Sequence, residues 1–475
     1  MATFVSRRWT QLLIASLIAV VAGDQALAQN FRQEPIDRSL SRKGTALKRY
    51  VKAPGNDPAM QALYDNYFTR YFFPALKQSD SAGLSKIGDL RYSLFKDFLW
   101  PAEASIQQDL TERARRHALG VLGRRNEYAP AVSYNAVLVL GGLDAVYGSD
   151  ARNDKRPPQP LPAANEILCK IVQQGVKQEW PQYLEVSALI GLQRHAKYAS
   201  SMPRKNQGET YRALLAAANQ KKFPAGTDEA VPGWIKRQAT DGLASLAAAS
   251  PRVDVFAKAI LAVADDSALT HSARSEVAAL LNKINFDNAQ KDNFNGYFAI
   301  LQKLAATVAY EMLGTVNEFK ELQLNGRVRG AAAMLLDQNK FFVEEDEIRL
   351  QRRFLASELR NNRDAIAALK PIAGDRSGDL DTYVNAFDGA LSATLDKEMS
   401  DFRVAEALES MAKQIDRVTP KELKPEMPAG SGTRGSDSKG SDSRGSGTSG
   451  SDSKGSDSKP AGGSGTKEEN GFNGL

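Results

Sequence analysis

Apolar residues recur every three or four positions through most of this chain, and that spacing constrains its fold more than any other feature. Alanine-rich stretches show it over about residues 102–122, 129–147, 163–177, 182–198, 209–220, 232–249, 253–264, 272–284 and 290–320. Alternating runs of β-branched residues, bounded by Asn-Gly or Asp-Gly turns, are absent from the sequence. We therefore predict an all-α protein in which no sheet forms.

Three further segments carry helical spacing. An aromatic stripe from about Pro58 to Leu76 is expected to pack into a core rather than to hold a ligand. The segment Phe341–Arg363 begins with acidic residues and continues with arginines, a charge order that suits the helix dipole. The amphipathic stretch from Leu380 to Val418 is expected either to close the helical body or to mediate self-association.

One pattern recurs along the chain, a small residue followed four and seven positions later by larger ones. Its copies are Ala136-Leu140-Leu143, Ala188-Leu192-His195, Ala239-Leu243-Leu246 and Ala273-Val277-Leu280. The alanine lets a neighbouring helix approach closely, and the larger residues fill the seam between stacked helix pairs. The chain here resembles the HEAT and armadillo class of helical-repeat proteins, particularly in the segment Trp234–Leu243, and the resemblance covers about residues 102–284. It implies an irregular α-solenoid of HEAT-like helical hairpins, with an ordinary irregular α-domain as the alternative.

The first 28 residues have the layout of a secretory signal peptide. Arg7 and Arg8 precede an apolar stretch from Leu12 to Ala22, and Ala26-Leu27-Ala28 forms a small-x-small cleavage site before Gln29. The apolar stretch is shorter than the about 20 residues that span a bilayer. We expect cleavage, export to a bacterial periplasm or cell surface, and no integral membrane span in the mature protein. An uncleaved anchor and a twin-arginine export route are the alternatives.

These patterns divide the chain into consecutive segments. They are a signal peptide (1–28), a loosely ordered polar leader (29–57), N-terminal helices (58–100), HEAT-like repeats (101–320), long C-terminal helices (321–420) and a tail (429–475). The tail repeats Gly-Ser-Asp-Ser-Lys or its arginine variant and has almost no apolar side chains to bury, so we predict that it is disordered.

Cysteine content and charge exclude several functional classes. Cys169 is the only cysteine, so neither an intramolecular disulfide nor a cysteine-based metal cluster can form, and we expect this thiol to be a small buried side chain. The net charge of +6 arises from 62 basic and 56 acidic residues without a strongly basic block. Binding to nucleic acid is therefore not expected.

The three histidines offer no recognisable catalytic or metal site. His117, His195 and His271 lie far apart in the sequence, and no His-Glu-x-x-His motif places two of them on one helix face. We predict that each is hydrogen-bonded or faces solvent. The sequence also lacks a Gly-x-Ser-x-Gly elbow and a Walker loop. We assign no catalytic, cofactor-binding or metal-binding residue.

The leading hypothesis is an exported, non-enzymatic interaction or scaffold protein whose partner is another protein of the cell envelope. One alternative is an envelope enzyme, a glycan- or ester-active hydrolase or lyase, whose acids and bases only the fold brings together. A second alternative is a structural component of the cell surface. The oligomeric state is left open.

Overall fold

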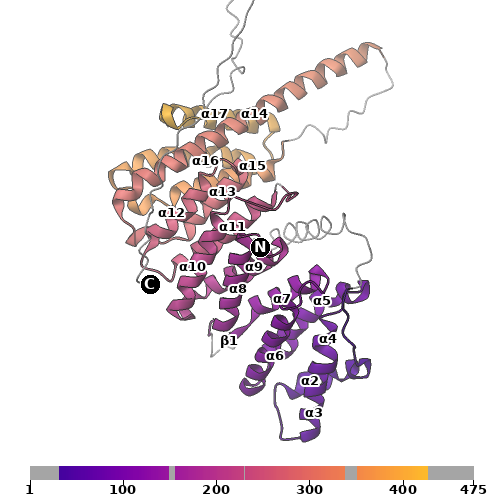
Figure 1. Ribbon diagram of the computed structural model, residues 1–475. Coiled ribbons are helices and arrows are strands. Elements are labelled where there is room, and N and C mark those ends of the chain that lie inside the picture. Colours follow the sequence, from indigo (N-terminus) through magenta and orange to yellow (C-terminus); the bar gives the residue numbers. More distant parts are fainter. Residues whose placement is uncertain (1–30, 149–155, 229, 337–349, 426–475) are drawn as a thin grey trace, which may run out of the picture. The chain divides into compact units, whose positions relative to one another are not determined.

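The computed structural model describes residues 31–148, 156–228, 230–336 and 350–425, with the backbone alone over 322–336. The predicted signal peptide (1–28), the acidic start of the segment Phe341–Arg363 and the predicted tail (429–475) lie outside these residues. The described part of the chain is predominantly helical (Figure 1), which confirms the predicted fold class at that level.

The prediction that the polar leader is loosely ordered is wrong from Arg38 to Tyr50. A 3-10 turn, η1 (Arg38–Lys43), leads directly into α2 (Gly44–Tyr50). Leu47, Tyr50 and Val51 are buried in the core between flanking basic residues that remain at the surface. A few apolar side chains at helical spacing are thus enough to order a segment whose composition is polar.

The aromatic stripe packs into the core as predicted. It forms α3 (Pro58–Tyr67), a π-helical turn η2 (Phe68–Phe72) and α4 (Phe73–Ala75). Phe68 and Phe72 each meet the ring of Phe98 edge-on, with centroids 5.2 and 5.6 Å apart. Phe98 belongs to a second π-helical turn, η3 (Leu94–Leu99), which continues α5 (Ser81–Ser93). These contacts join the first helices into one aromatic cluster.

The next helices pack as successive antiparallel pairs (Figure 1). They are α6 (Ala104–Leu122) with α7 (Pro130–Gly142), α8 (Pro162–Val176) with α9 (Gln182–Lys197), α10 (Arg204–Ala218) with α11 (Ala230–Ala247), and α12 (Val253–Ala264) with α13 (His271–Ala278). Proline at the first turn of α7 and α8, and Thr270 as the N-cap of α13, mark where the chain re-enters a helix.

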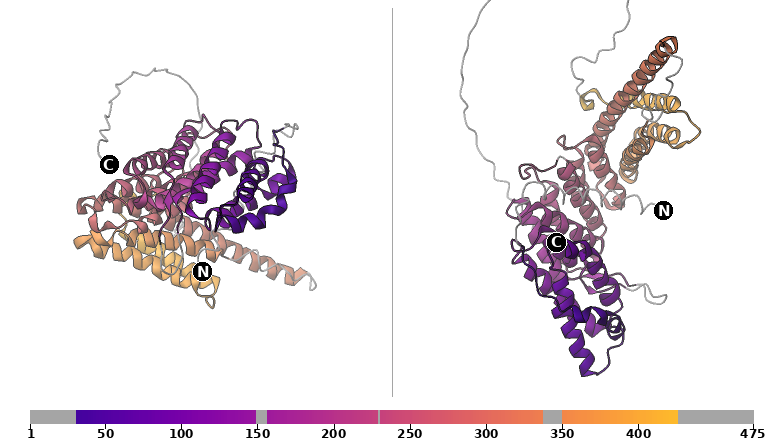
Figure 2. Two further views of the ribbon diagram at one scale, coloured as in Figure 1. Left: turned by 90° about the horizontal axis from the view of Figure 1, so that it is seen from below. Right: turned by 90° about the vertical axis from the view of Figure 1, so that its right-hand side faces the viewer.

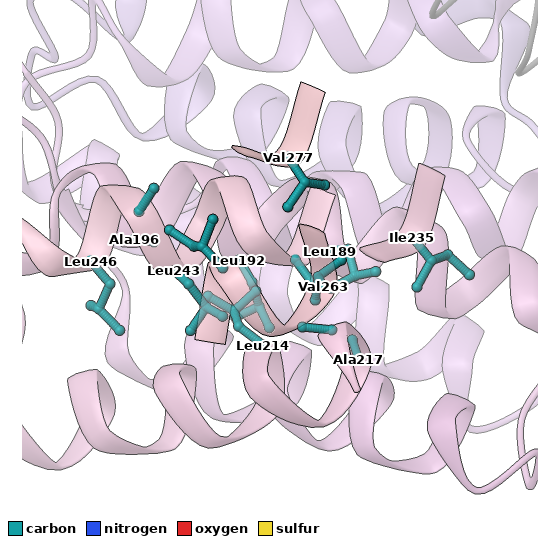
Figure 3. Close-up of a cluster of buried hydrophobic side chains, with 14 of the residues drawn as sticks. Leu189, Leu192, Ala196, Leu214, Ala217, Ile235, Leu243, Leu246, Val263 and Val277 are labelled. Atoms are coloured by element: carbon teal, nitrogen blue, oxygen red, sulfur yellow. The ribbon is translucent and has the colours of Figure 1, made fainter. Parts of the chain in front are cut away.

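The recurring sequence pattern lies on a single layer of these helices. Its four copies belong to α7, α9, α11 and α13 with the residues that follow them, and each of these helices packs against the next. Helices α8, α10 and α12 also pack in order, as the opposite layer. Figure 3 shows side chains from α9 to α13 gathered into one cluster between the layers. Most residues of the pattern are buried, and Ala273 and Leu280 are partly buried.

Helices α7 and α9 approach one another more closely than side chains would allow. A Cβ atom placed on Gly141 would lie 2.6 Å from the Cα of Gly191, and one placed on Gly191 would lie 2.9 Å from the Cα of Gly141. The two backbones therefore touch where both residues lack a side chain. Gly141 is thus a helix-packing position.

The prediction that no sheet forms is wrong at one place. β1 (Asp144–Val146) pairs antiparallel with β2 (Gln159–Pro160), in the connection between α7 and α8. The proline-rich sequence around Pro157 favours an extended backbone, and an extended chain needs only one neighbouring extended segment to form backbone hydrogen bonds. The pair is too short to show period-two alternation in the sequence.

The C-terminal helices pack on the end of these layers. They are α14 (Phe294–Leu336), α15 (Arg352–Ala367), α16 (Ser377–Leu395) and α17 (Asp401–Val418). α15 packs against α13 and α16, and α17 packs against α16 and α14, as Figure 2 shows. The predicted stretch from Leu380 to Val418 is thus a helical pair within this body. Among the described helices, none is both long and apolar enough to cross a bilayer.

We expect Gly141→Ala to lower the free energy of unfolding by about 1–3 kcal/mol, because the new methyl group must push α7 and α9 apart. Gly120 is the matched control, since it lies inside α6 and a Cβ atom added there would meet nothing within 4 Å. Gly120→Ala should raise stability by up to about 1 kcal/mol through helix propensity. Urea unfolding monitored by circular dichroism measures both, and a neutral Gly141→Ala would contradict the tight crossing.

Candidate binding groove

A groove of about 1630 Å³ lies among η3, the first half of α6, the residues around β1 and β2, and the end of α9. Its lining comes from Lys96, Trp100, Pro101, Ala102, Ala104, Gln107, Gln108, Thr111, Glu112, Asp144, Ala145, Val146, Tyr147, Gly148, Arg156, Pro157, Pro158, Leu161, Arg194 and Tyr198. Pockets for small molecules usually measure about 300–1000 Å³. This groove is larger, a size that suits an extended ligand.

Trp100 owes its position to the π-helical turn η3. Its backbone N–H donates to the carbonyl of Phe95 at 2.8 Å, the five-residue step that defines such a turn. The indole is 54% exposed, an unusual state for so large an aromatic side chain. Lys96, in the same turn, is exposed and holds its ammonium 5.1 Å from the centre of the Tyr92 ring.

An ion pair between a buried Asp144 and a partly exposed Arg194 joins β1 to α9 at the wall of the groove. Arg194 donates from Nη1 and Nη2 to the two carboxylate oxygens of Asp144, at 2.8 and 2.6 Å. Asp144 is 2% exposed, and this burial raises its pKa above the ordinary value while the guanidinium acts in the opposite direction. The same guanidinium lies 5.7 Å from the centre of the Tyr198 ring. The pair fixes both the strand and the helix end.

Two more polar contacts involve residues that line the groove. The hydroxyls of Thr111 and Tyr147 lie 3.0 Å apart, and burial raises the pKa of Tyr147. On the next residue of α6, the carboxylate of Glu112 accepts two hydrogen bonds from Arg115, both of 2.8 Å. These interactions lower the pKa of Glu112. Both acids of the lining, Glu112 and Asp144, therefore already have arginine partners.

The two acids of the lining differ in state, although both have arginine partners. Hydrogen bonds from Arg115 lower the pKa of Glu112. Asp144 has a raised pKa because it is buried, and with 2% of its surface exposed it is poorly placed to exchange a proton with a substrate. Within the residues that the structure describes, no group of three or more His, Cys, Asp or Glu side chains has a geometry that could hold a metal ion. Apolar and aromatic residues make up most of the remaining lining, which also contains two glutamine amides.

The structure brings none of the three histidines to the groove. His195 has no exposed surface, accepts at Nδ1 from the Asn165 amide at 3.3 Å, and has a pKa lowered by burial to about 3. His271 is partly exposed, with Nε2 lying 3.2 Å from a carboxylate oxygen of Glu358. For both, the prediction of a partner or solvent contact is confirmed.

For His117 the same expectation stays a prediction. Its ring is buried and stacks on Phe73 with centroids 5.0 Å apart. Nδ1 has no hydrogen-bond partner among the described residues, and burial lowers the pKa of the ring to about 3. Stacking on Phe73 is the aromatic contact that packs this ring.

The prediction for Cys169 is confirmed. The thiol is buried beside Asn165 and Thr210, with sulfur–oxygen distances of 3.8 and 3.9 Å. Burial raises its pKa to about 12, so the reactive thiolate does not form near neutral pH.

Two buried carboxyl groups lie outside the groove. Glu185 of α9 and Glu358 of α15 are 1% and 4% exposed, and burial raises the pKa of each to about 7. In both cases one carboxylate oxygen lacks a hydrogen-bond partner among the described residues. Neither group reaches a surface where a substrate would meet it, so we assign them to stability rather than catalysis.

Removing Arg194 should be costly, since it leaves the Asp144 carboxylate buried without its partner. We expect Arg194→Gln to lower the free energy of unfolding by about 3 kcal/mol. The double variant Asp144→Asn with Arg194→Gln has no unpaired charge and should recover most of that loss. Urea unfolding of the wild type, both single variants and the double variant completes a double-mutant cycle. If the losses in free energy of unfolding of the two single variants simply add up in the double variant, the two residues are not coupled.

The pKa of Glu185 predicts a pH dependence of stability. In the folded protein this carboxyl keeps its proton up to about pH 7, whereas in the unfolded chain it loses it near the ordinary value of 4.5. The folded state binds more protons in that window, so this residue's contribution to stability falls as the pH rises from about 4.5 to 7. Glu185→Gln should therefore gain stability relative to the wild type across the window, by on the order of 1–3 kcal/mol.

Urea unfolding at several pH values measures this relative gain. The matched control is Glu179→Gln, which removes an exposed carboxyl just before α9. A difference between wild type and Glu185→Gln that stays constant from pH 4.5 to 7 would contradict the assignment.

Comparisons with known proteins found no similarity that bears on the groove: no family model matches the chain, and no curated protein or solved structure matches it significantly. Any function must therefore be argued from the groove and from the fold that builds it.

Proposed function

We propose that this chain is an exported, non-enzymatic interaction protein that binds an extended segment of another envelope protein in the groove. The observation that carries the proposal is the combination of a large groove, an exposed Trp100, and acids already paired with arginines. Aromatic side chains surrounded by polar groups are typical of protein recognition surfaces.

The helical layers support a scaffold of stacked hairpins like those of HEAT-type repeats. The four copies of the sequence pattern lie on α7, α9, α11 and α13, and each of these helices packs against the next. In repeat proteins of this kind, each hairpin buries its apolar face on its neighbours, and the stack presents extended binding surfaces. We infer an irregular array, because β1 and β2 interrupt the connection between two of the pairs.

Export rests on the sequence of residues 1–28, with its charged start, apolar stretch and cleavage site before Gln29. A single buried cysteine is compatible with an oxidising compartment, because it has no second cysteine to pair with in the chain. We propose a bacterial periplasm or cell surface as the location of the mature protein.

Binding is favoured over turnover by the state of the titratable groups. The enzyme alternative needs acids, bases and histidines that converge on a substrate. His195 has no exposed surface and His117 is buried against Phe73, while Glu112 and Asp144 are paired with arginines. No residue of the groove is thus placed as a catalytic group.

Site-specific photocrosslinking in the native cell envelope tests the proposal. A benzoylphenylalanine replacing Trp100 should give one reproducible adduct with a protein, because this side chain lines the groove. The same replacement at Phe354, which is 53% exposed in α15 and outside the groove, is the matched control and should not give that adduct. Mass spectrometry of the adduct should also show that the mature chain begins at Gln29.

Three results would overturn the proposal. The first is the same adduct from both positions, which would show that the groove does not select the partner. The second is an adduct with glycan alone. The third is turnover in a broad glycan and ester screen that Asp144→Asn or Glu112→Gln abolishes, since this would make the groove an active site.

A further inference from the structure

Helix α15 docks on α13, although the long helix α14 separates the two along the chain. α15 also packs against α14, α16 and the 3-10 turn that follows α13, η5 (Ala279–Lys283). Asn362 of α15 donates from Nδ2 to the hydroxyl of Ser275 in α13 at 2.9 Å, and both side chains are buried. We call this contact between α13 and α15 the docking seam.

One acid lies in the docking seam, one helical turn before Asn362. Glu358 is 4% exposed, and the buried Leu355 and Leu359 flank it on α15. Its Oε1 atom has no hydrogen-bond partner among the described residues. Nε2 of His271, the first residue of α13, lies 3.2 Å from this atom but is not aligned for a hydrogen bond. A buried carboxyl with an unbonded oxygen is costly to ionise.

Two further carboxylates face Glu358 from the helices packed against α15. Glu276 of α13 and Glu311 of α14 both raise the pKa of Glu358 by repulsion, in addition to the larger effect of burial. Glu276 has a cation of its own, since Nε of Arg237 lies 2.8 Å from its carboxylate. Among the residues that the structure describes, His271 is the one basic group within ion-pair distance of Glu358. Glu358 therefore depends for a counter-charge on an imidazole, which is charged or neutral according to pH.

The other charged groups of the packed elements have partners of their own. They are Arg363 of α15 with Asp388 of α16, Lys283 of η5 with Asp241, Lys303 of α14 with Asp265, and Arg274 of α13 with the carbonyl of Ala264. These partners leave the Glu358 carboxyl without a permanent cation beside it.

The docking seam therefore holds one proton. Either the Glu358 carboxyl carries it, or the His271 imidazole carries it and pairs with the carboxylate, and the two groups titrate together. Loss of this proton leaves an ionised carboxylate in the seam, beside a neutral imidazole and two like charges. A buried charge without a partner is destabilising.

The direction of the pH dependence follows from the number of bound protons. In the closed seam, burial and the two neighbouring glutamates raise the pKa of Glu358 to about 7. In an open seam the carboxyl meets water and titrates near its ordinary value of 4.5. The closed seam binds more protons between these values, so its stability relative to the open seam falls as the pH rises from about 4.5 to 7.

We propose that the docking seam is a pH-sensitive switch, in which the shared proton keeps α15 on α13 and loss of that proton releases α15. The inference goes beyond the proposed function, because Glu358, His271, Glu276 and Glu311 all lie outside the lining of the groove. The carboxyl of Glu358 makes the seam respond to pH, since an amide of the same shape has no proton to lose.

Hydrogen exchange on the full chain, followed by mass spectrometry, tests the switch. Protection factors are compared, because they correct for the pH dependence of exchange in an unfolded chain. The protection of α15 and of the start of α13 should fall about tenfold between pH 6 and 8. This is the fall expected for a carboxyl with a pKa of about 7 in the closed seam and 4.5 in the open one.

Three glutamine substitutions locate the proton. Glu358→Gln keeps the shape and removes the titrating group, so the protection of α15 should stay constant from pH 6 to 8. Glu185→Gln is the matched control, because it removes a buried carboxyl of similar pKa from α9, and the fall in α15 should persist. Glu311→Gln removes a facing charge at an exposed position, so the midpoint of the fall should shift to lower pH by a few tenths of a unit.

The switch is wrong if the protection of α15 in the wild type is the same at pH 6 and 8, or if Glu358→Gln loses protection as the wild type does. It is also wrong if Glu185→Gln abolishes the fall in α15 as fully as Glu358→Gln, because exchange there would then report unfolding of the whole chain. Glu311→Gln decides the question if Glu358→Gln does not fold, and an unshifted midpoint in that variant would contradict the switch.

Discussion

The backbone contact between Gly141 and Gly191 is the constraint on which the rest of this structure depends. It brings α7 and α9 closer than any side chain would permit, and it does so near the C-terminal ends of both helices. Asp144 and Arg194 each follow one of these glycines by three residues. The crossing therefore places Asp144 beside Arg194, and their ion pair fixes the position of β1. The groove is a consequence of helix packing.

The Asp144–Arg194 pair also sets the electrostatics of this wall of the groove. A carboxylate taken out of water costs free energy unless a cation and hydrogen bonds replace the solvent, and Arg194 supplies both to Asp144. Arg194 offsets only part of this cost, since the pKa of Asp144 stays above its ordinary value. The rest of the lining includes the Trp100 indole, the glutamine amides and the residues of β1.

Helical periodicity in the sequence predicted helices. The helix predicted over 253–264 matches α12 at both ends. His195 stands at an apolar position of the repeated pattern and is buried there. What it could not predict depends on contacts between distant residues. Tyr147 meets Thr111, and Arg194 meets Asp144, across sequence separations that no local pattern reports. The two strands are too short for an alternating signal, and the ordering of the leader through Leu47 was hidden by its basic neighbours.

One connection between the described helices contains extended chain. Inside a stack of helical hairpins, each helix is covered by its neighbours and its backbone is satisfied by its own hydrogen bonds. The connection between α7 and α8 departs from this rule, because β1 exposes extended backbone beside an aromatic side chain. Extended backbone at a surface is a liability for aggregation unless it is short or covered. Here β1 is three residues long and lines a groove, so little of its backbone can pair with another chain.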